Sequence, residues 1–233
     1  MNIAIVAAAG QGRRMGGRRA KQFLELAGVP VIIHTLKKFE EAALIQRIVV
    51  VLPAEDSAEF LEIAGKYGFR KLHKVVRGGP TRAQSVWRGI QSLRPIETQI
   101  VAIHDGVRPF VTPDEIDRTV KAAEENGAAL LVGPVPDTIK QVSDGFVERT
   151  IDRETLRRAL TPQCFKFELL YKAFESAKDL GSDITDESYL VEQLGHRVML
   201  VEGSSRNIKL TRPEDLAIAE QLLKDETSCG RRV

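Results

Sequence analysis

The regular alternation of short apolar runs with segments of helical periodicity constrains the fold of this chain more than any other feature. Runs rich in β-branched residues predict strands at residues 2–8, 45–52, 71–76, 98–104, 128–135 and 197–203. Helical patterns cover residues 31–43, 55–66, 81–93, 113–125 and 212–225. Several of the strands are apolar throughout, which is typical of a parallel sheet with helices on both faces. We therefore predict an α/β fold, a Rossmann-like three-layer sandwich around a mostly parallel sheet.

Residues 136–162 depart from this alternation. Polar and apolar residues alternate there on both sides of Ser143, Asp144 and Gly145, a sequence typical of a hairpin turn. We interpret the segment as a β-hairpin arm that protrudes from a single domain spanning residues 1–233. Because an isolated hairpin is barely stable in water, a protruding arm of this kind favours contact with another subunit.

The composition argues against several classes of partner. The chain has 233 residues and a net charge of only +2, so no overall field favours nucleic acid or an anionic membrane surface. No apolar run approaches the length of a membrane span. Cys164 and Cys229 are too few and too distant in sequence for a disulfide framework or a zinc site, which favours a reducing compartment. We expect a cytoplasmic protein that binds neither nucleic acid nor membrane.

A glycine-rich loop follows the first predicted strand, and it fails two common templates. The dinucleotide fingerprint G-x-G-x-x-G requires a third glycine where this chain has Met15. The mononucleotide loop G-x-x-x-x-G-K-[ST] requires lysine and a hydroxyl residue after the second glycine, where this chain has Arg18 and Arg19. The loop is therefore neither a standard dinucleotide loop nor a standard P-loop.

A third interpretation of the loop is a triphosphate site. Gly10 and Gly12 permit close approach of backbone N–H groups to phosphate oxygens, while Arg14 and Lys21 supply counter-charges. A solvated basic loop with glycines at its turns is the alternative that the residues leave open.

The sequence of this loop, "AAAGQGRRMGGRRAKQF" at residues 7–23, resembles the signature of the sugar-phosphate nucleotidyltransferases. The K-Q-F sequence at its end points to the cytidylyltransferase branch that activates 2-C-methyl-D-erythritol 4-phosphate for isoprenoid synthesis. Further matches run along the chain and are "GGPTRAQSVWRGI" (78–90), "HDGVRPFVT" (104–112), "PVPDTIK" (134–140), "TIDRETLRRALTPQCF" (150–165), "ITDESYLVEQLG" (184–195) and "VEGSSRNIKLTRPEDLAIAE" (201–220). Their order and spacing make the resemblance specific, and it covers nearly the whole chain.

The resemblance implies a reaction in which a substrate phosphate oxygen attacks the α-phosphorus of CTP and pyrophosphate leaves. Catalysis of this kind consists mostly of charge neutralisation and in-line positioning. The resemblance implies Mg²⁺ as the cofactor, and Asp105 is the candidate metal ligand because it follows a strand, where ligands bind in such sheets. One carboxylate with phosphate oxygens suits Mg²⁺. An aspartate that only caps a turn before Gly106 is the other interpretation.

The remaining roles are also carried over from the resemblance. The implied catalytic residues are Arg14, Lys21 and Lys209. The implied nucleotide-binding residues are Ala8, Ala9, Gly10, Gly12, Gly78, Gly79, Arg82 and Ser85. The implied substrate-binding residues are Asp105, Arg108, Thr138, Arg153, Thr161, Thr185 and Lys209. In the family the arm clasps a second subunit, so we expect a homodimer formed through residues 136–162.

Some features of the sequence weaken the match or leave other functions open. Family members often have two alanines where this chain has Gly106 and Val107. We interpret His104 as structural and Trp87 as a core residue. A D-ribitol 5-phosphate cytidylyltransferase shares the loop motifs and remains the alternative enzyme. A non-catalytic nucleotide-binding regulator and a dinucleotide-dependent oxidoreductase are alternatives of other classes.

Overall fold

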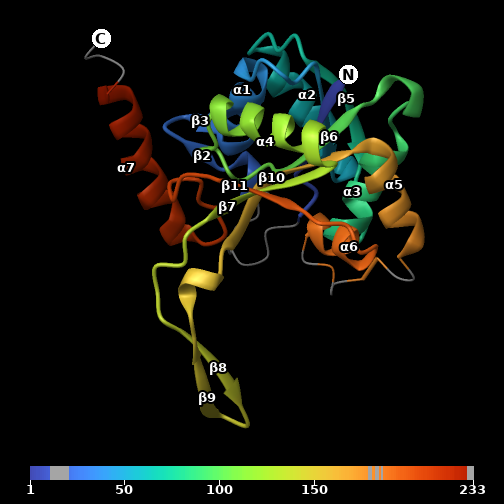
Figure 1. Ribbon diagram of the computed structural model, residues 1–233. Helices are drawn as coiled ribbons and strands as arrows, with labels where there is room; N and C mark the ends of the chain where they lie inside the picture. Colours follow the sequence, from blue (N-terminus) through green and yellow to red (C-terminus); the bar gives the residue numbers. More distant parts are fainter. Residues whose placement is uncertain (11–20, 178–179, 182–183, 185, 230–233) are drawn as a thin grey trace.

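The computed structural model describes residues 1–10, 21–177, 180–181, 184 and 186–229. Within these residues a central sheet of seven strands runs through the molecule (Figure 1). Its strands, in spatial order, are β11 (Met199–Glu202), β7 (Ala128–Gly133), β10 (Arg158–Lys166), β6 (Ile100–Asp105), β1 (Asn2–Ala7), β4 (Arg47–Leu52) and β5 (Leu72–Arg77). All six strands predicted from the sequence are present, and the predicted α/β class is confirmed.

Most neighbouring strands in this sheet are parallel. Strand β1 pairs in parallel with β4 and β6, β4 pairs with β5, and β11 pairs with β7. Because the register places Ala7 beside Asp105, the carboxyl ends of β1 and β6 lie at the same edge of the sheet.

Strand β10 is the exception, because it is antiparallel to both β6 and β7. The sequence analysis did not predict it and assigned residues 158–162 to the arm. The strand contains Thr161, Pro162 and Gln163, so it shows neither an apolar run nor a regular alternation, and its pairing shifts register between Ala159 and Gln163. Its place is fixed by two partner strands that lie far away in sequence.

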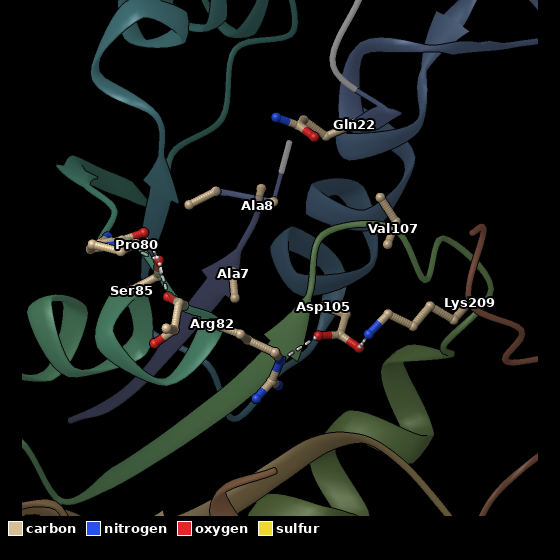
Figure 2. Close-up of a pocket in the computed structure, with 13 residues that line it drawn as sticks. Ala7, Ala8, Gln22, Pro80, Arg82, Ser85, Asp105, Val107 and Lys209 are labelled. Atoms are coloured by element: carbon tan, nitrogen blue, oxygen red, sulfur yellow. Dashed lines mark hydrogen bonds and ion pairs between the residues drawn. The ribbon is translucent and has the colours of Figure 1, made fainter. Parts of the chain in front are cut away.

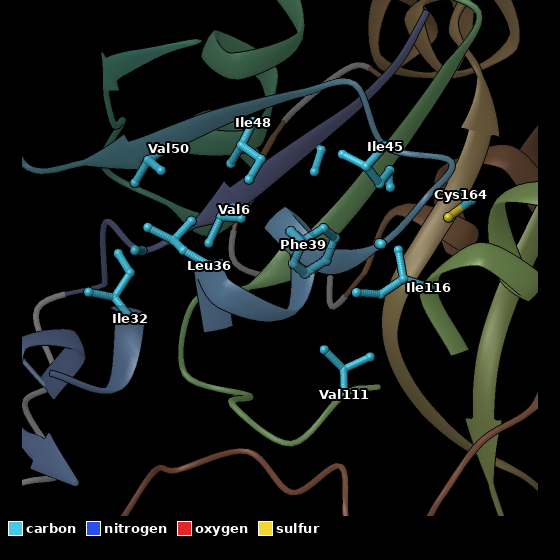
Figure 3. Packing of buried hydrophobic residues seen from close by; sticks show 14 of the residues in the cluster. Val6, Ile32, Leu36, Phe39, Ile45, Ile48, Val50, Val111, Ile116 and Cys164 are labelled. Atoms are coloured by element: carbon cyan, nitrogen blue, oxygen red, sulfur yellow. The ribbon is translucent and has the colours of Figure 1, made fainter. Parts of the chain in front are cut away.

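Helices cover both faces of the sheet. One face carries α1 (Val31–Glu41), α2 (Ser57–Gly65) and α4 (Pro113–Asn126), and the other carries α3 (Arg82–Gln91), α5 (Phe167–Ser176) and α6 (Glu187–Gln193). Along β1, Ala4 and Val6 belong to the first apolar cluster and Ile3 and Ile5 to the second, so the strand is buried on both faces. Figure 3 shows the first cluster, in which Phe39 of α1 packs against the sheet.

A third apolar cluster joins the last helix to the body. Helix α7 (Pro213–Cys229) contributes Ala219, which packs with Leu26, Val107 and Leu210. Leu26 belongs to a small two-stranded ribbon of β2 (Glu25–Leu26) and β3 (Val29–Pro30). The cluster therefore ties the segment after β11 to the residues that follow β6.

The predicted hairpin arm is confirmed. Strands β8 (Ile139–Ser143) and β9 (Phe146–Ile151) project away from the body of the molecule (Figure 1). Asp144 and Gly145 at the tip have φ of 49° and 82°, as expected for a turn that matches the twist of a hairpin. The hairpin ends at Ile151, and the last five residues of the segment expected to form the arm lie in β10 of the central sheet.

Of two residues interpreted as structural, Trp87 is partly buried against the second apolar cluster and His104 is buried in the sheet. Trp87 of α3 stacks on Phe174 of α5, with ring centroids 5.3 Å apart. His104 of β6 is fully buried and its ring contacts Phe39 edge-on at 4.9 Å. Within the part of the chain that the structure describes, no helix has both the length and the apolar character needed to cross a membrane.

Candidate active site

A cavity of about 630 Å³ lies at the carboxyl ends of β1 and β6, beside the start of α3 (Figure 2). The residues that line it are Ala7, Ala8, Ala9, Gly10, Gln22, Gly79, Pro80, Thr81, Arg82, Ser85, Asp105, Val107 and Lys209. This is the edge at which ligands bind in sheets of this type. Ala7, Gln22, Pro80, Thr81 and Val107 line the cavity but were not predicted as site residues.

Asp105, the last residue of β6, is the centre of charge in this cavity. Its Oδ1 lies 3.1 Å from Nε of Arg82, and its Oδ2 lies 2.9 Å from Nζ of Lys209 and 3.3 Å from Nε of Arg108. Figure 2 shows the Arg82 and Lys209 contacts. Burial by itself would raise the pKa of this carboxyl, but the cations outweigh burial and hold the pKa far below its usual value. Asp105 is therefore ionised throughout the physiological pH range.

Local capping places Arg82 at this point. Thr81 accepts a hydrogen bond from the backbone N–H of Gln84, and the Gln84 side chain accepts one from the N–H of Thr81. This capping box starts α3 at Arg82 beside the cavity. Lys209 lies near the other end of the sequence. The N–H of the next residue, Leu210, donates to the carbonyl of Val107 (3.0 Å), which holds this segment beside the cavity.

Arg82 has a second partner that the sequence analysis missed. Its Nη1 lies 2.6 Å from Oε1 of Glu187, a fully buried residue at the start of α6. Asp186 is the N-cap of this helix. Nothing in the local sequence marks Glu187 as buried, because its burial depends on β10 and α3, which are distant in sequence.

A chain of hydrogen bonds links the backbone of Asp105 to Thr161, His104 and Arg108. The backbone N–H of Asp105 donates to Oγ1 of Thr161 (3.2 Å), and this hydroxyl lies 3.0 Å from Nδ1 of His104. His104 Nε2 lies 3.1 Å from the carbonyl oxygen of Arg108, which can only accept, so Nε2 carries the proton and Nδ1 accepts from Thr161. Burial lowers the pKa of His104 to about 4, which keeps the ring neutral and preserves this arrangement.

Thr161 and Arg108, both expected to bind substrate, contact Asp105 but are not part of the cavity lining. The Thr161 hydroxyl is occupied by the bonds just described, and Asn207 donates to the Thr161 carbonyl (2.9 Å). Arg108 donates to the carbonyl of Asn207 (2.8 Å) as well as contacting Asp105. Both side chains thus hold Asp105 in place, and their contact with substrate stays a prediction.

The glycine turn after β5 is required by packing. A Cβ atom on Gly78 would lie 2.3 Å from Cβ of Ala9, a contact that real side chains do not make. The Ser85 hydroxyl accepts from the N–H of Gly79 (3.0 Å) and lies 2.8 Å from the carbonyl of Thr81, to which it can donate. The turn and the first strand therefore meet closely, and together they form one wall of the cavity.

Other expected site residues are placed as follows. Ala8, Ala9 and Gly10 line the cavity together with Arg82, Ser85 and Lys209. Gly12, Arg14, Thr185 and the side chain of Lys21 lie outside the described residues. Thr138 and Arg153 belong to the arm segment and are not part of the cavity lining; Arg153 donates to the carbonyl of Pro136 (2.8 Å). Whether the arm residues reach a site in another subunit stays a prediction.

Comparison with known proteins identifies the family. The model of the family described as IspD, 2-C-methyl-D-erythritol 4-phosphate cytidylyltransferase, matches residues 2–225. The chain belongs to this family. A curated member from Pelotomaculum thermopropionicum is 44% identical over 95% of this chain and 93% of its own length. Another from Geobacillus thermodenitrificans is 46% identical over 94% of this chain and 96% of its own length.

Solved structures give the same assignment. The 4-diphosphocytidyl-2C-methyl-D-erythritol synthase from Anaerococcus prevotii superposes with a TM-score of 0.84 at 30% identity and covers 96% of both chains. The 2-C-methyl-D-erythritol 4-phosphate cytidylyltransferase from Thermus thermophilus gives a TM-score of 0.75 at 33% identity, over 94% of this chain and 98% of that chain. The predicted enzyme class, a nucleotidyltransferase of this family, is confirmed. The relatives named here are all named for the methylerythritol compound rather than for ribitol phosphate.

Proposed function

We propose that the cavity at Asp105 is the place where this cytidylyltransferase joins CTP to 2-C-methyl-D-erythritol 4-phosphate. A phosphate oxygen of the methylerythritol phosphate forms a new bond to the α-phosphorus of CTP. The bond from that phosphorus to the oxygen that bridges the α- and β-phosphates breaks. The products are 4-diphosphocytidyl-2-C-methyl-D-erythritol and pyrophosphate. The observation that carries the proposal is a buried, ionised carboxylate that contacts three cations at the carboxyl edge of a parallel sheet.

The cations supply the main catalytic effect. Charge builds up on the oxygens around the α-phosphorus in the transition state, and fixed positive groups in a partly buried site stabilise it. Lys209 and Arg82 already face the cavity. Arg14 and Lys21 join them in this proposal through the match of the glycine loop to the family signature. Arg108 is not part of the cavity lining and acts through Asp105, which it contacts.

The site fits a divalent cation that binds together with the triphosphate. Among the described residues no cluster of three or more histidine, cysteine or acidic side chains could hold a metal by itself. Mg²⁺ is often held by one or two carboxylates completed by substrate phosphates. Asp105 would hold the ion, which would neutralise phosphate charge when bound. Lys209 and Arg82, which contact Asp105 in the structure, then become available to phosphate oxygens.

One wall of the cavity suits the nucleoside. Ala8, Ala9 and Gly10 present small side chains and backbone, and Gly79 and Ser85 line the same cavity. Gly12 and Gly78 complete the nucleotide-binding set in this proposal. Small residues let a flat base approach the backbone closely, where N–H and C=O groups can read its edge.

We also infer that the enzyme is a cytoplasmic homodimer whose arm contacts the second subunit. The arm exposes Val142, Phe146 and Val147 by 65%, 77% and 61%, which is apolar surface that a contact would cover. Thr138 and Arg153 would then serve substrate binding in the neighbouring site. Cys164 is a free, buried thiol, as expected in a reducing compartment.

A single assay tests the proposed reaction. Pyrophosphate release is measured with each of the four nucleoside triphosphates against methylerythritol phosphate and D-ribitol 5-phosphate, in the presence of Mg²⁺. We expect turnover with CTP and methylerythritol phosphate. Preference for ribitol phosphate would overturn the assignment of methylerythritol phosphate as the substrate. Absence of turnover with every pair would overturn the proposed reaction.

A further inference from the structure

Glu187 has no role in the reaction proposed above, yet it fixes one of the cations of the site. Its side chain is fully buried, and its Oε1 lies 2.6 Å from Nη1 of Arg82. The same guanidinium uses Nε to contact Oδ1 of Asp105 at 3.1 Å. Arg82 thus bridges two carboxylates, of which Asp105 lines the cavity and Glu187 does not.

The fold holds Glu187 rigidly. The side-chain carbonyl of Gln163 in β10 accepts hydrogen bonds from the N–H groups of Glu187 (3.1 Å) and Ser188 (2.9 Å). Asp186 caps the same helix by accepting from the N–H of Tyr189 (3.1 Å). The second oxygen of Glu187, Oε2, has no hydrogen-bond partner among the described residues. Burial raises the pKa of this carboxyl, and the Arg82 guanidinium at 2.6 Å opposes that rise and is the charge that stabilises the ionised form.

The contact between Glu187 and Arg82 affects how strongly Arg82 binds Asp105. Arg82, Arg108 and Lys209 all contact Asp105, and each competes with a metal ion for its oxygens. Glu187 attracts Arg82 from the other side. If its negative charge were removed, Arg82 would keep Asp105 as its one carboxylate partner among the described residues, and the positive potential at the cavity would rise.

We propose that Glu187 is a positioning residue that divides Arg82 between two carboxylates and so keeps Asp105 available to the divalent cation that accompanies the triphosphate. The inference rests on the proposed function, because it assumes that Asp105 binds that cation. It predicts a specific signature for Glu187→Gln, which keeps the shape and an acceptor oxygen but removes one negative charge. The variant should bind the free triphosphate at least as well as the wild type, while the metal contributes less.

The test compares nucleotide affinity with and without metal. The full-length protein is titrated by calorimetry with the non-hydrolysable α,β-methylene analogue of CTP, once in EDTA and once in saturating Mg²⁺. In the wild type, Mg²⁺ should tighten binding of the analogue. In Glu187→Gln that gain should shrink by at least about tenfold, because a charge acts strongly in a partly buried site. The Kd in EDTA should be equal to or tighter than that of the wild type.

Matched variants separate the possible causes. Glu192→Gln removes an exposed carboxylate from the same helix and should behave as the wild type. Asp105→Asn should abolish the gain from Mg²⁺. If the wild type does not bind the analogue, or if Asp105→Asn keeps the full gain, the proposed function or its metal site fails rather than the role of Glu187.

Two results would overturn the role of Glu187. The first is a full Mg²⁺ gain in Glu187→Gln. The second is an equal weakening of binding in EDTA and in Mg²⁺, which would indicate a merely structural role. If circular dichroism shows that Glu187→Gln does not fold, the double variant Arg82→Gln/Glu187→Gln is used, because it removes both charges of the buried pair and leaves neither unpaired. The competing cation is then absent, so its Mg²⁺ gain should be at least that of the wild type, and a smaller gain would overturn the proposal.

Discussion

The ammonium of Lys209 lies 2.9 Å from Oδ2 of Asp105, the carboxylate that we propose for the divalent cation. The Asp105 side chain is only 8% exposed whereas that of Lys209 is 34% exposed, so the lysine is the solvent-facing partner of the pair. An ammonium on a flexible stem changes partner more easily than a guanidinium fixed by two carboxylates. Lys209 is therefore well suited to turn from Asp105 to a phosphate oxygen of the substrate.

Replacing Lys209 by Gln should lower kcat by about two orders of magnitude, because loss of one charge-stabilising group typically costs about 3 kcal/mol in the transition state. Steady-state pyrophosphate release with CTP and methylerythritol phosphate measures the effect. Arg212→Gln, which removes an exposed cation three residues along the chain, should leave kcat unchanged. A kcat of Lys209→Gln within a few-fold of the wild type would contradict a role at the α-phosphate.

His104 should make the fold sensitive to mild acid. Burial lowers the pKa of this ring from 6.5 to about 4, so the unfolded chain binds a proton in a pH range where the folded chain does not. Stability is therefore lost as pH falls from about 6.5 to about 4, with a total of the order of 3 kcal/mol for this group. Asp105 adds to this loss only near the acid end of the window, where its carboxyl begins to bind a proton in the unfolded chain but stays ionised in the folded one.

Urea unfolding at a series of pH values measures the slope, and His104→Gln is the comparison. Glutamine supplies a donor and an acceptor but does not titrate, so the part of the slope due to His104 should disappear. The difference between the two proteins removes the contribution of other titrating groups. Equal slopes for the variant and the wild type would show that folding does not change proton uptake by this ring, which would contradict its lowered pKa.

Gly78→Ala should destabilise the protein by about 1–3 kcal/mol, because the new methyl group would lie within 2.3 Å of Cβ of Ala9 and something must shift. Ala9→Gly in the same chain removes the clash and should restore much of the lost stability, which chemical denaturation can measure. Gly65→Ala, in α2, meets no atom within 4 Å and should not destabilise. A double variant as unstable as Gly78→Ala would show that the destabilising clash is not with Ala9.

Phe146→Ser should shift the protein from dimer to monomer, because Phe146 is the most exposed of the large apolar side chains on the arm, at 77%. Analytical ultracentrifugation measures the shift, and kcat should fall with it if the arm serves the neighbouring site. Leu61→Ser, which removes an exposed apolar side chain (53%) from α2, is the control. A wild-type protein that is monomeric and fully active would contradict the proposed arm contact.

The sequence by itself determined six of the seven strands of the central sheet, most helices, the hairpin and the position of Asp105 at the end of β6. These features follow from local patterns: period-two and helical spacing, turn residues, and the rule that ligands bind beyond parallel strands. Gly78 was expected to bind nucleotide through the resemblance, and the structure adds that close packing on Ala9 also requires glycine there.

The tertiary structure alone decided which side chains surround Asp105. Strand β10 has no local signature, and its antiparallel place between β6 and β7 brings Thr161 behind Asp105 and Gln163 onto the start of α6. That contact in turn fixes Glu187 against Arg82. The burial, pKa and ion pairing of these groups depend on neighbours that are distant in sequence. Such contacts produce no local pattern from which they could be predicted.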